Sequence, residues 1–192
     1  MIITLSANSS LDKTVNLAQT LVPGIVHRIT STHTDVGGKG INVGRVAQEA
    51  LAAVRCVLPA RPQDPILGLL DQVKLPYVST DISEAVRTNL TIIDDRGQTT
   101  KINEPGPTLT AGQQKSLLGA LKEQARDLED ADWVVLSGSL PPGLPDDFYL
   151  TCLKEMETCP GRFALDTSGS PLRALGKALG TRKGRFDETE LF

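Results

Sequence analysis

Short apolar runs alternate with helix-like stretches along most of this chain. Four runs end in small or polar residues, as buried strands do, and they are residues 2–7, 54–58, 133–137 and 162–166. The stretches with apolar residues at three- and four-residue steps are residues 40–53, 65–73, 111–128, 145–157 and 171–179. This alternation predicts an α/β fold with a mostly parallel central sheet and helices on both faces.

Two segments interrupt the alternation, residues 13–36 and 86–104. In the second, two β-prone runs flank the turn Asp94-Asp95-Arg96-Gly97, which predicts a hairpin. In the first, residues 28–35 are polar and alternating, which is typical of a solvated strand at a sheet edge. We expect the two segments to form a small antiparallel β lid beside the main sheet, with all 192 residues in a single domain.

The composition excludes several classes of function. The net charge of -3 and the pI near 5.4 argue against a nucleic-acid partner, because duplex binding needs a basic face. We find neither an apolar stretch of the ~20 residues that a membrane helix needs nor a signal-peptide layout, and we expect a cytoplasmic protein without a membrane partner. The three cysteines form no Cys-x-x-Cys pair, so neither a disulfide framework nor a zinc site is supported.

Residues 35–45 place a glycine cluster, Lys39 and Asn42 at the expected start of a helix. Glycines let a ligand approach the backbone, and the free N–H groups and dipole of a helix start favour an anion. The nucleotide P-loop needs Ser or Thr after its lysine, whereas Lys39 is followed by Gly40. The dinucleotide motif should directly follow the first buried strand, which here lies about thirty residues earlier. A dinucleotide-dependent reductase is therefore disfavoured.

Polar residues follow three of the predicted strands, at residues 8–12, 137–143 and 166–169. Turns and helix caps use the same residue types, so each group alone is weak evidence for a site. In open parallel sheets, however, ligands bind outside the carboxyl ends of the strands. The joint placement of these groups with the glycine loop predicts a ligand site at that edge.

Four segments together resemble the PfkB branch of the ribokinase-like carbohydrate kinases, and most closely the bacterial 1-phosphofructokinases. They are Asn8-Ser-Ser-Leu-Asp12, Gly37-Gly-Lys-Gly-Ile-Asn42, Arg87-Thr-Asn89 leading into Asn103-Glu-Pro-Gly-Pro107, and Ser137-Gly-Ser-Leu-Pro-Pro-Gly143. The resemblance implies a ribokinase-like three-layer α/β/α fold whose lid often forms a homodimer contact. It also implies transfer of a phosphoryl group from ATP, with Mg²⁺, to a ketose phosphate. Fructose 1-phosphate is the first expectation, and tagatose 6-phosphate stays open because both sugars would use the same positions.

The resemblance also implies roles for individual residues. Those matched to the sugar hydroxyls are Asp12, Gly38 and Asn42, and those matched to the sugar phosphate are Lys39, Arg87, Asn89 and Ser139. Gly37 and Ser137 complete the expected substrate site. A carboxylate accepts hydrogen bonds from hydroxyls and an arginine fork suits phosphate oxygens, so the residue types fit these roles. The alternative for Arg87 is an ordinary surface cation on a strand.

The chain departs from the family pattern in its C-terminal part. The Gly-Ala-Gly-Asp segment that carries the family's general base is absent from the 192 residues, so we assign no catalytic residue and expect a C-terminally truncated family member. Glu190 fits the acidic position of a magnesium-organising turn, with Asp187 where an Asn is expected. A non-catalytic homologue that only binds sugar phosphate therefore stays open as an alternative.

Overall fold

The central sheet consists of five parallel strands. The computed structural model describes residues 1–180, and its central strand order is β5-β4-β1-β8-β9. The strands are β1 (Ile2–Leu5), β4 (Val54–Ala60), β5 (Tyr77–Asp81), β8 (Trp133–Ser137) and β9 (Arg162–Asp166). All neighbouring pairs are parallel, which confirms the predicted sheet and its four predicted strands. Strand β5 was not predicted, because this short strand at the end of the sheet lacks the continuous apolar run of a buried strand.

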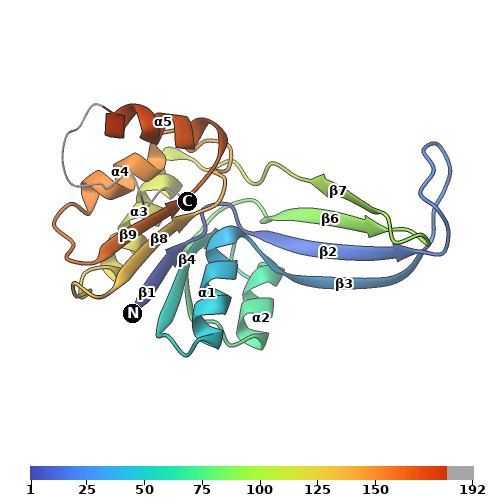
Figure 1. Cartoon of the computed structure of the whole chain (residues 1–192), viewed down its shortest axis with the longest axis horizontal. Coiled ribbons are helices and arrows are strands. Elements are labelled where there is room, and N and C mark those ends of the chain that lie inside the picture. The colour runs from blue at the N-terminus through green and yellow to red at the C-terminus, as the bar shows by residue number, and fades with distance from the viewer. Residues whose placement is uncertain (181–192) are drawn as a thin grey trace.

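Helices cover both faces of this sheet, as predicted (Figure 1). One face carries α1 (Lys39–Glu49) and α2 (Pro65–Gln72), and the other carries α3 (Ala111–Gln124), α4 (Phe148–Glu155) and α5 (Gly169–Gly180). Successive strand residues point to opposite faces, so Val57 packs with the α3 side while Cys56 and Leu58 pack with the α1 side. The result is a three-layer α/β/α body with an apolar cluster in each interlayer space.

Local capping sets where two of these helices begin. Asp64 accepts a hydrogen bond from the Ile66 N–H at the start of α2, and Pro65 occupies the first helical position. Thr110 and Gln113 form a capping box at the start of α3. The predicted helix over residues 145–157 is shorter, since α4 begins at Phe148.

The lid is a separate four-stranded sheet that projects from the body (Figure 1). It contains β2 (Ser10–Leu17), β3 (Ile29–Gly37), β6 (Arg87–Ile93) and β7 (Thr99–Asn103), in the order β3-β2-β6-β7. The outer pairs are antiparallel and β6 and β7 form the predicted hairpin, but the central β2–β6 pair is parallel. The prediction of a wholly antiparallel lid was wrong, because β2 and β6 both leave the body in the same direction.

The segment after β1 also differs from its prediction. Residues 8–12 were expected to follow the first strand ahead of the lid, with the lid segment beginning at residue 13, but β2 begins at Ser10. Asp12 therefore lies within a lid strand, at a register position opposite Asn89 of β6 and Asp35 of β3. None of the helices within residues 1–180 is long and apolar enough to cross a membrane.

Candidate functional site

The base of the lid brings Asp12 and Asn89 into direct contact. The Asn89 amide donates hydrogen bonds to Asp12 Oδ1 and to Ser10 Oγ, each at 3.0 Å. The Ser10 hydroxyl in turn donates to Asp12 Oδ1 at 2.7 Å. The parallel register explains this cluster, because Ser10 lies opposite Arg87 and Asp12 opposite Asn89 on one face of the lid. Ser10 was missed as a site residue, although it lies inside the motif that contains Asp12.

Gly37 and Gly38 leave the space that this cluster occupies. A Cβ atom at Gly37 would lie 2.3 Å from the Asp12 carboxyl carbon. At Gly38 the backbone φ is +117°, and a Cβ atom would lie 2.7 Å from Ser6 Oγ. The glycines therefore allow the lid base and the start of α1 to pack against the β1–β2 connection without side chains between them.

The start of α1 follows directly after lid strand β3 and therefore lies at the base of the lid. Gly38 is the N-cap residue, and within residues 1–180 no side chain caps the first N–H groups of the helix. Lys39 is the first helical residue, and Asn42 lies exposed in the first turn. Free N–H groups, the helix dipole and a lysine together favour an anion at this position. The anion site stays a prediction.

Arg87 lies half-buried at the start of β6, close to this cluster. Its Nη1 donates to the backbone carbonyl of Glu104 at 3.3 Å, whereas its buried Nε makes no hydrogen bond within residues 1–180. Burial lowers the pKa of the Arg87 guanidinium from its ordinary value, and the negative charge of Asp12 opposes that effect. A guanidinium with spare donors near an open helix start can bind a phosphate.

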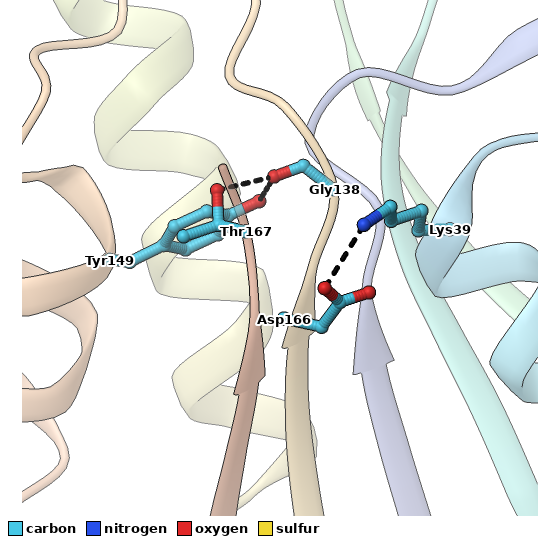
Figure 2. Close-up of polar contacts among 5 residues, drawn as sticks. All are labelled: Lys39, Gly138, Tyr149, Asp166 and Thr167. Atoms are coloured by element: carbon cyan, nitrogen blue, oxygen red, sulfur yellow. Dashed lines mark hydrogen bonds and ion pairs between the residues drawn. The ribbon is translucent and has the colours of Figure 1, made fainter. Parts of the chain in front are cut away.

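The backbone of Gly138 is held in place by the start of α4 and the end of β9 (Figure 2). Its carbonyl accepts hydrogen bonds from the Tyr149 hydroxyl of α4 at 3.0 Å and from Thr167 Oγ1 after β9 at 2.9 Å. Its N–H donates to the backbone carbonyl of Asp166 at 2.8 Å. Burial raises the pKa of Tyr149, so its hydroxyl stays a proton donor. These contacts fix the backbone between Ser137 and Ser139.

Lys39 reaches across this strand edge to Asp166 (Figure 2). Lys39 Nζ lies 3.0 Å from Asp166 Oδ1, and each side chain is 52% exposed. An ion pair this exposed contributes little to stability, so both groups remain available to a ligand. Asp166 was noted in the sequence as a strand-end residue, but no role was assigned to it.

The buried polar atoms that lack a partner gather around the same region. Of the five such side-chain atoms within residues 1–180, four belong to Asn8, Arg87, Asn89 and Ser137, and the fifth is Thr80 Oγ1. Buried polar groups in proteins are normally hydrogen-bonded. Arg87, Asn89 and Ser137 are predicted substrate-site residues, and Asn8 contacts Ser139, another residue of that predicted site. The unpaired atoms are therefore consistent with a polar ligand.

Asn8 connects the lid to the β8 loop and was missed by the sequence analysis. Its amide nitrogen donates to the backbone carbonyl of Pro105 at 3.0 Å and to Ser139 Oγ at 3.2 Å. Pro105 lies just after β7, where the chain returns from the lid to the body. Asn8 opens the motif that ends in Asp12, which is the signal that could have found it.

The predicted metal residue cannot be placed. Glu190 and Asp187 lie outside the described residues, and within residues 1–180 no cluster of His, Cys, Asp and Glu could hold a metal ion by itself. The magnesium assignment to Glu190 stays a prediction.

A match to a protein family covers the part of the chain that contains the four motifs. The model of the pfkB family carbohydrate kinases matches residues 6–165, which include every substrate-site residue described above. The chain belongs to the pfkB family of carbohydrate kinases. This match confirms the resemblance inferred from the four sequence segments.

Individual relatives are similar over most of this chain. A 1-phosphofructokinase of Xanthomonas campestris is 36% identical over 175 residues, which are 90% of this chain and 54% of the relative. Phosphofructokinase-2 from Escherichia coli, solved in complex with fructose-6-phosphate, gives a TM-score of 0.81 at 27% identity, over 90% of this chain and 56% of that one.

A more distant solved structure supports the fold. A ribokinase of Arabidopsis thaliana, complexed with ribose and ATP, gives a TM-score of 0.60 at 15% identity over 88% of this chain and 53% of that one. Together with the phosphofructokinase-2 match, it confirms the predicted ribokinase-like fold. The chain spans about half the length of the relatives it matches.

Proposed function

We propose that this chain forms the sugar-phosphate site of an ATP-dependent ketose-phosphate kinase, with fructose 1-phosphate as the substrate and fructose 1,6-bisphosphate as the product. The observation that carries this proposal is the Asp12–Asn89 cluster next to the uncapped start of α1 and the spare donors of Arg87. The similarity to a 1-phosphofructokinase supports the choice of sugar.

Each proposed role follows from the chemistry of the residue. The Asp12 carboxylate, oriented by Ser10 and Asn89, accepts hydrogen bonds from sugar hydroxyls, and the exposed Asn42 amide offers both a donor and an acceptor. The Arg87 guanidinium and the Ser139 hydroxyl donate to oxygens of the sugar phosphate. The backbone N–H groups at Gly38 and beyond add the partial positive charge of the helix start.

We propose that ATP and Mg²⁺ bind at the carboxyl edge of the central sheet, beside the sugar-phosphate site. Lys39 and Asp166 fit this use, because a lysine can contact a phosphate and Mg²⁺ is commonly held by one or two carboxylates together with substrate phosphates. When bound, ATP supplies the phosphoryl group, and the metal neutralises charge on the phosphates. The contribution of Lys39 is to hold positive charge beside the sugar site.

A tagatose 6-phosphate kinase remains a second candidate because the same side chains would hold either ketose phosphate. Fructose 6-phosphate enters the test as well, since it is the ligand of the E. coli phosphofructokinase-2 structure. The position of the phosphate on the sugar distinguishes these candidates, and binding data can measure it directly.

Calorimetric titration tests the proposal most directly. The chain is titrated with fructose 1-phosphate, fructose 6-phosphate and tagatose 6-phosphate, and ADP release is then followed with Mg-ATP. We expect the tightest binding for fructose 1-phosphate. Binding without turnover is expected of these 192 residues, which lack the Gly-Ala-Gly-Asp segment, and it would leave the non-catalytic alternative open. No binding of any of the three sugars would refute the proposed site.

Replacing Arg87 should weaken binding of the sugar phosphate. We expect Arg87→Ala to cost about 1–3 kcal/mol, or roughly 5- to 150-fold in Kd, because a charge-assisted contact is lost. The Kd of Arg87→Lys should lie between those of the wild type and Arg87→Ala, since lysine keeps the positive charge but lacks the two-pronged guanidinium group. Arg28→Ala, at an exposed arginine of the lid, is the matched control. Equal affinity of Arg87→Ala and the control would remove Arg87 from the site.

We also propose a homodimer through the lid. One lid face carries Leu90 and Ile92 of β6 and Ile102 of β7, and these apolar side chains remain half-buried or exposed in the single chain. Ile102 is 55% exposed. An apolar sheet face that water still reaches can be covered by the same face of a second copy.

A further inference from the structure

Asn8 lies at the junction between the lid and the β8 loop. Its side chain comes from the connection between β1 and β2, and the residue is 6% exposed. One amide hydrogen is donated to the carbonyl of Pro105, in the segment where the chain returns from the lid to the body (the lid return). The other is donated to Ser139 Oγ, at the proposed substrate site. A single buried side chain thus joins two segments that are separated by more than thirty residues in the sequence.

The acceptors fix which way this amide points. A backbone carbonyl can only accept a hydrogen bond, so the Asn8 nitrogen and not its oxygen must face Pro105. The oxygen is left on the other side, where it makes no hydrogen bond within residues 1–180. It lies instead against Gly106, where a Cβ atom would be 2.2 Å away.

Gly106 matches this arrangement in two ways. Its φ of +104° lies in the region that favours glycine, and its missing side chain leaves the space that the Asn8 oxygen fills. Gly106 lies between Pro105 and Pro107, which restrict the backbone on either side. The lid return is therefore a stiff segment that is held at one point by Asn8.

The contact with Ser139 also orients its hydroxyl. When Ser139 Oγ accepts from Asn8, one of its lone pairs is occupied and its own hydrogen is free to donate elsewhere. Ser139 itself is exposed, so that hydrogen can reach a ligand. A mobile hydroxyl would need to be ordered when a ligand binds, whereas one held by Asn8 is already oriented.

We propose that Asn8 is a positioning residue that latches the lid return at Pro105–Gly106 to Ser139, so that lid placement and hydroxyl orientation are coupled when the sugar phosphate binds. This inference rests on the proposed function for its effect on binding. The latch itself, as a contact that stiffens the lid return, is independent of which sugar is bound.

A double-mutant cycle tests the coupling. The Kd for fructose 1-phosphate is measured for the wild type, Asn8→Ala, Ser139→Ala and the double variant. Asn8→Ala should weaken binding about 3- to 10-fold, as expected for one lost neutral hydrogen bond. If Asn8 acts through Ser139, it should add little further loss in the Ser139→Ala background. Fully additive losses, or wild-type affinity in Asn8→Ala, would overturn the proposed coupling.

Amide hydrogen exchange tests the latch without a sugar. Exchange at Gly106 and Thr108 should speed up in Asn8→Ala, and to a smaller extent in Ser139→Ala, which leaves the Asn8–Pro105 hydrogen bond in place. Asn8→Asp serves as an isosteric second variant, because its carboxylate cannot donate to the Pro105 carbonyl and should also speed exchange. Unchanged exchange in both Asn8 variants would overturn the latch.

Asn16→Ala is the matched control for both measurements. Its amide also donates to a serine, Ser31 Oγ at 3.0 Å, but in the exposed part of the lid. It should change neither the Kd nor the exchange at Gly106 and Thr108. If the wild type binds none of the three ketose phosphates, the proposed function fails, and the exchange measurement still decides the latch.

Discussion

Gly37 and Asp12 are in direct contact at the base of the lid. The carboxyl group of Asp12 occupies the place where any side chain at position 37 would begin, 2.3 Å from the notional Cβ atom. The same carboxylate accepts hydrogen bonds from Ser10 and Asn89. The absence of a side chain at Gly37 therefore allows the Asp12 carboxylate to take the orientation that it has.

Gly37→Ala should therefore impair binding more than folding. The end of the Asp12 side chain can rotate away from the new methyl group, which preserves the fold but breaks its contacts with Ser10 and Asn89. We expect the Kd for fructose 1-phosphate to rise by about 10-fold or more, as for a lost hydrogen bond to a charged group. Calorimetry measures the Kd, and thermal unfolding reports stability.

Gly119→Ala is the control for this glycine substitution. Gly119 lies in the middle of α3 with open space around its Cβ position, so alanine should stabilise the helix by about 0.5–1 kcal/mol and leave the Kd unchanged. A Gly37→Ala variant with normal affinity would show that Asp12 does not contact the sugar in its present orientation.

The lid hairpin depends on Asp94 at the scale of the element. The Asp94 carboxylate accepts hydrogen bonds from the N–H groups of Arg96 and Gln98 at 2.9 Å each, and from Leu21 at 3.5 Å. It therefore holds both the β6–β7 turn and the long connection between β2 and β3. Burial acts to raise the pKa of Asp94, but the three N–H donors and nearby Arg96 hold it below its ordinary value.

Asp94 should make the lid sensitive to acid. Since its pKa is lower in the folded chain, its stabilising effect is complete above the unfolded pKa of about 3.9 and is lost as the pH falls through the lower folded value. Asp94→Asn removes this titration, so the variant should have a lower Tm at pH 7 and a smaller further loss on acidification. Thermal unfolding between pH 7 and pH 3 measures both effects.

Asp95→Asn is the matched control. Asp95 is the next residue, and its carboxylate accepts a hydrogen bond from the Thr20 hydroxyl at 2.9 Å but none from the turn backbone. The Tm of Asp95→Asn should fall with pH as that of the wild type does. If the Tm of Asp94→Asn depended on pH as that of the wild type does, other carboxylates would control acid unfolding.

The whole molecule combines a two-faced α/β body with a lid whose apolar side is only partly covered. The body has an apolar cluster on each face of its sheet, whereas Ile102 on the lid is 55% exposed. The proposed lid dimer would cover that side. It would also place two sugar-phosphate sites in one assembly, because each lid base carries its own Asp12 cluster.

Oligomeric mass tests this arrangement. Sedimentation of the wild type should give a dimer, and Ile102→Lys should weaken it at least 10-fold, because a charge would be buried in the contact. Leu51→Lys is the control, since Leu51 is 94% exposed but lies just after α1, away from the lid. A wild type that stays monomeric at tens of micromolar would contradict the dimer.

Local patterns were sufficient to predict much of this protein. The apolar periods of β1, β4, β8 and β9 and the glycine loop at the start of α1 depend on residues close together in the chain. The short motifs also predicted the family, because the resemblance depends on residue types at fixed spacing in the chain. The β6–β7 hairpin was predictable for the same reason, since its turn lies between its two strands.

Other features depended on pairings between distant segments. The parallel β2–β6 pair joins residues more than seventy positions apart, and it decides that Ser10, Asp12 and Asn89 meet. The Lys39–Asp166 pair and the bridge from Asn8 to Ser139 span even longer separations. Side-chain periodicity records which face of an element is buried but not which distant element lies against it, so these contacts became visible only once the strands were paired.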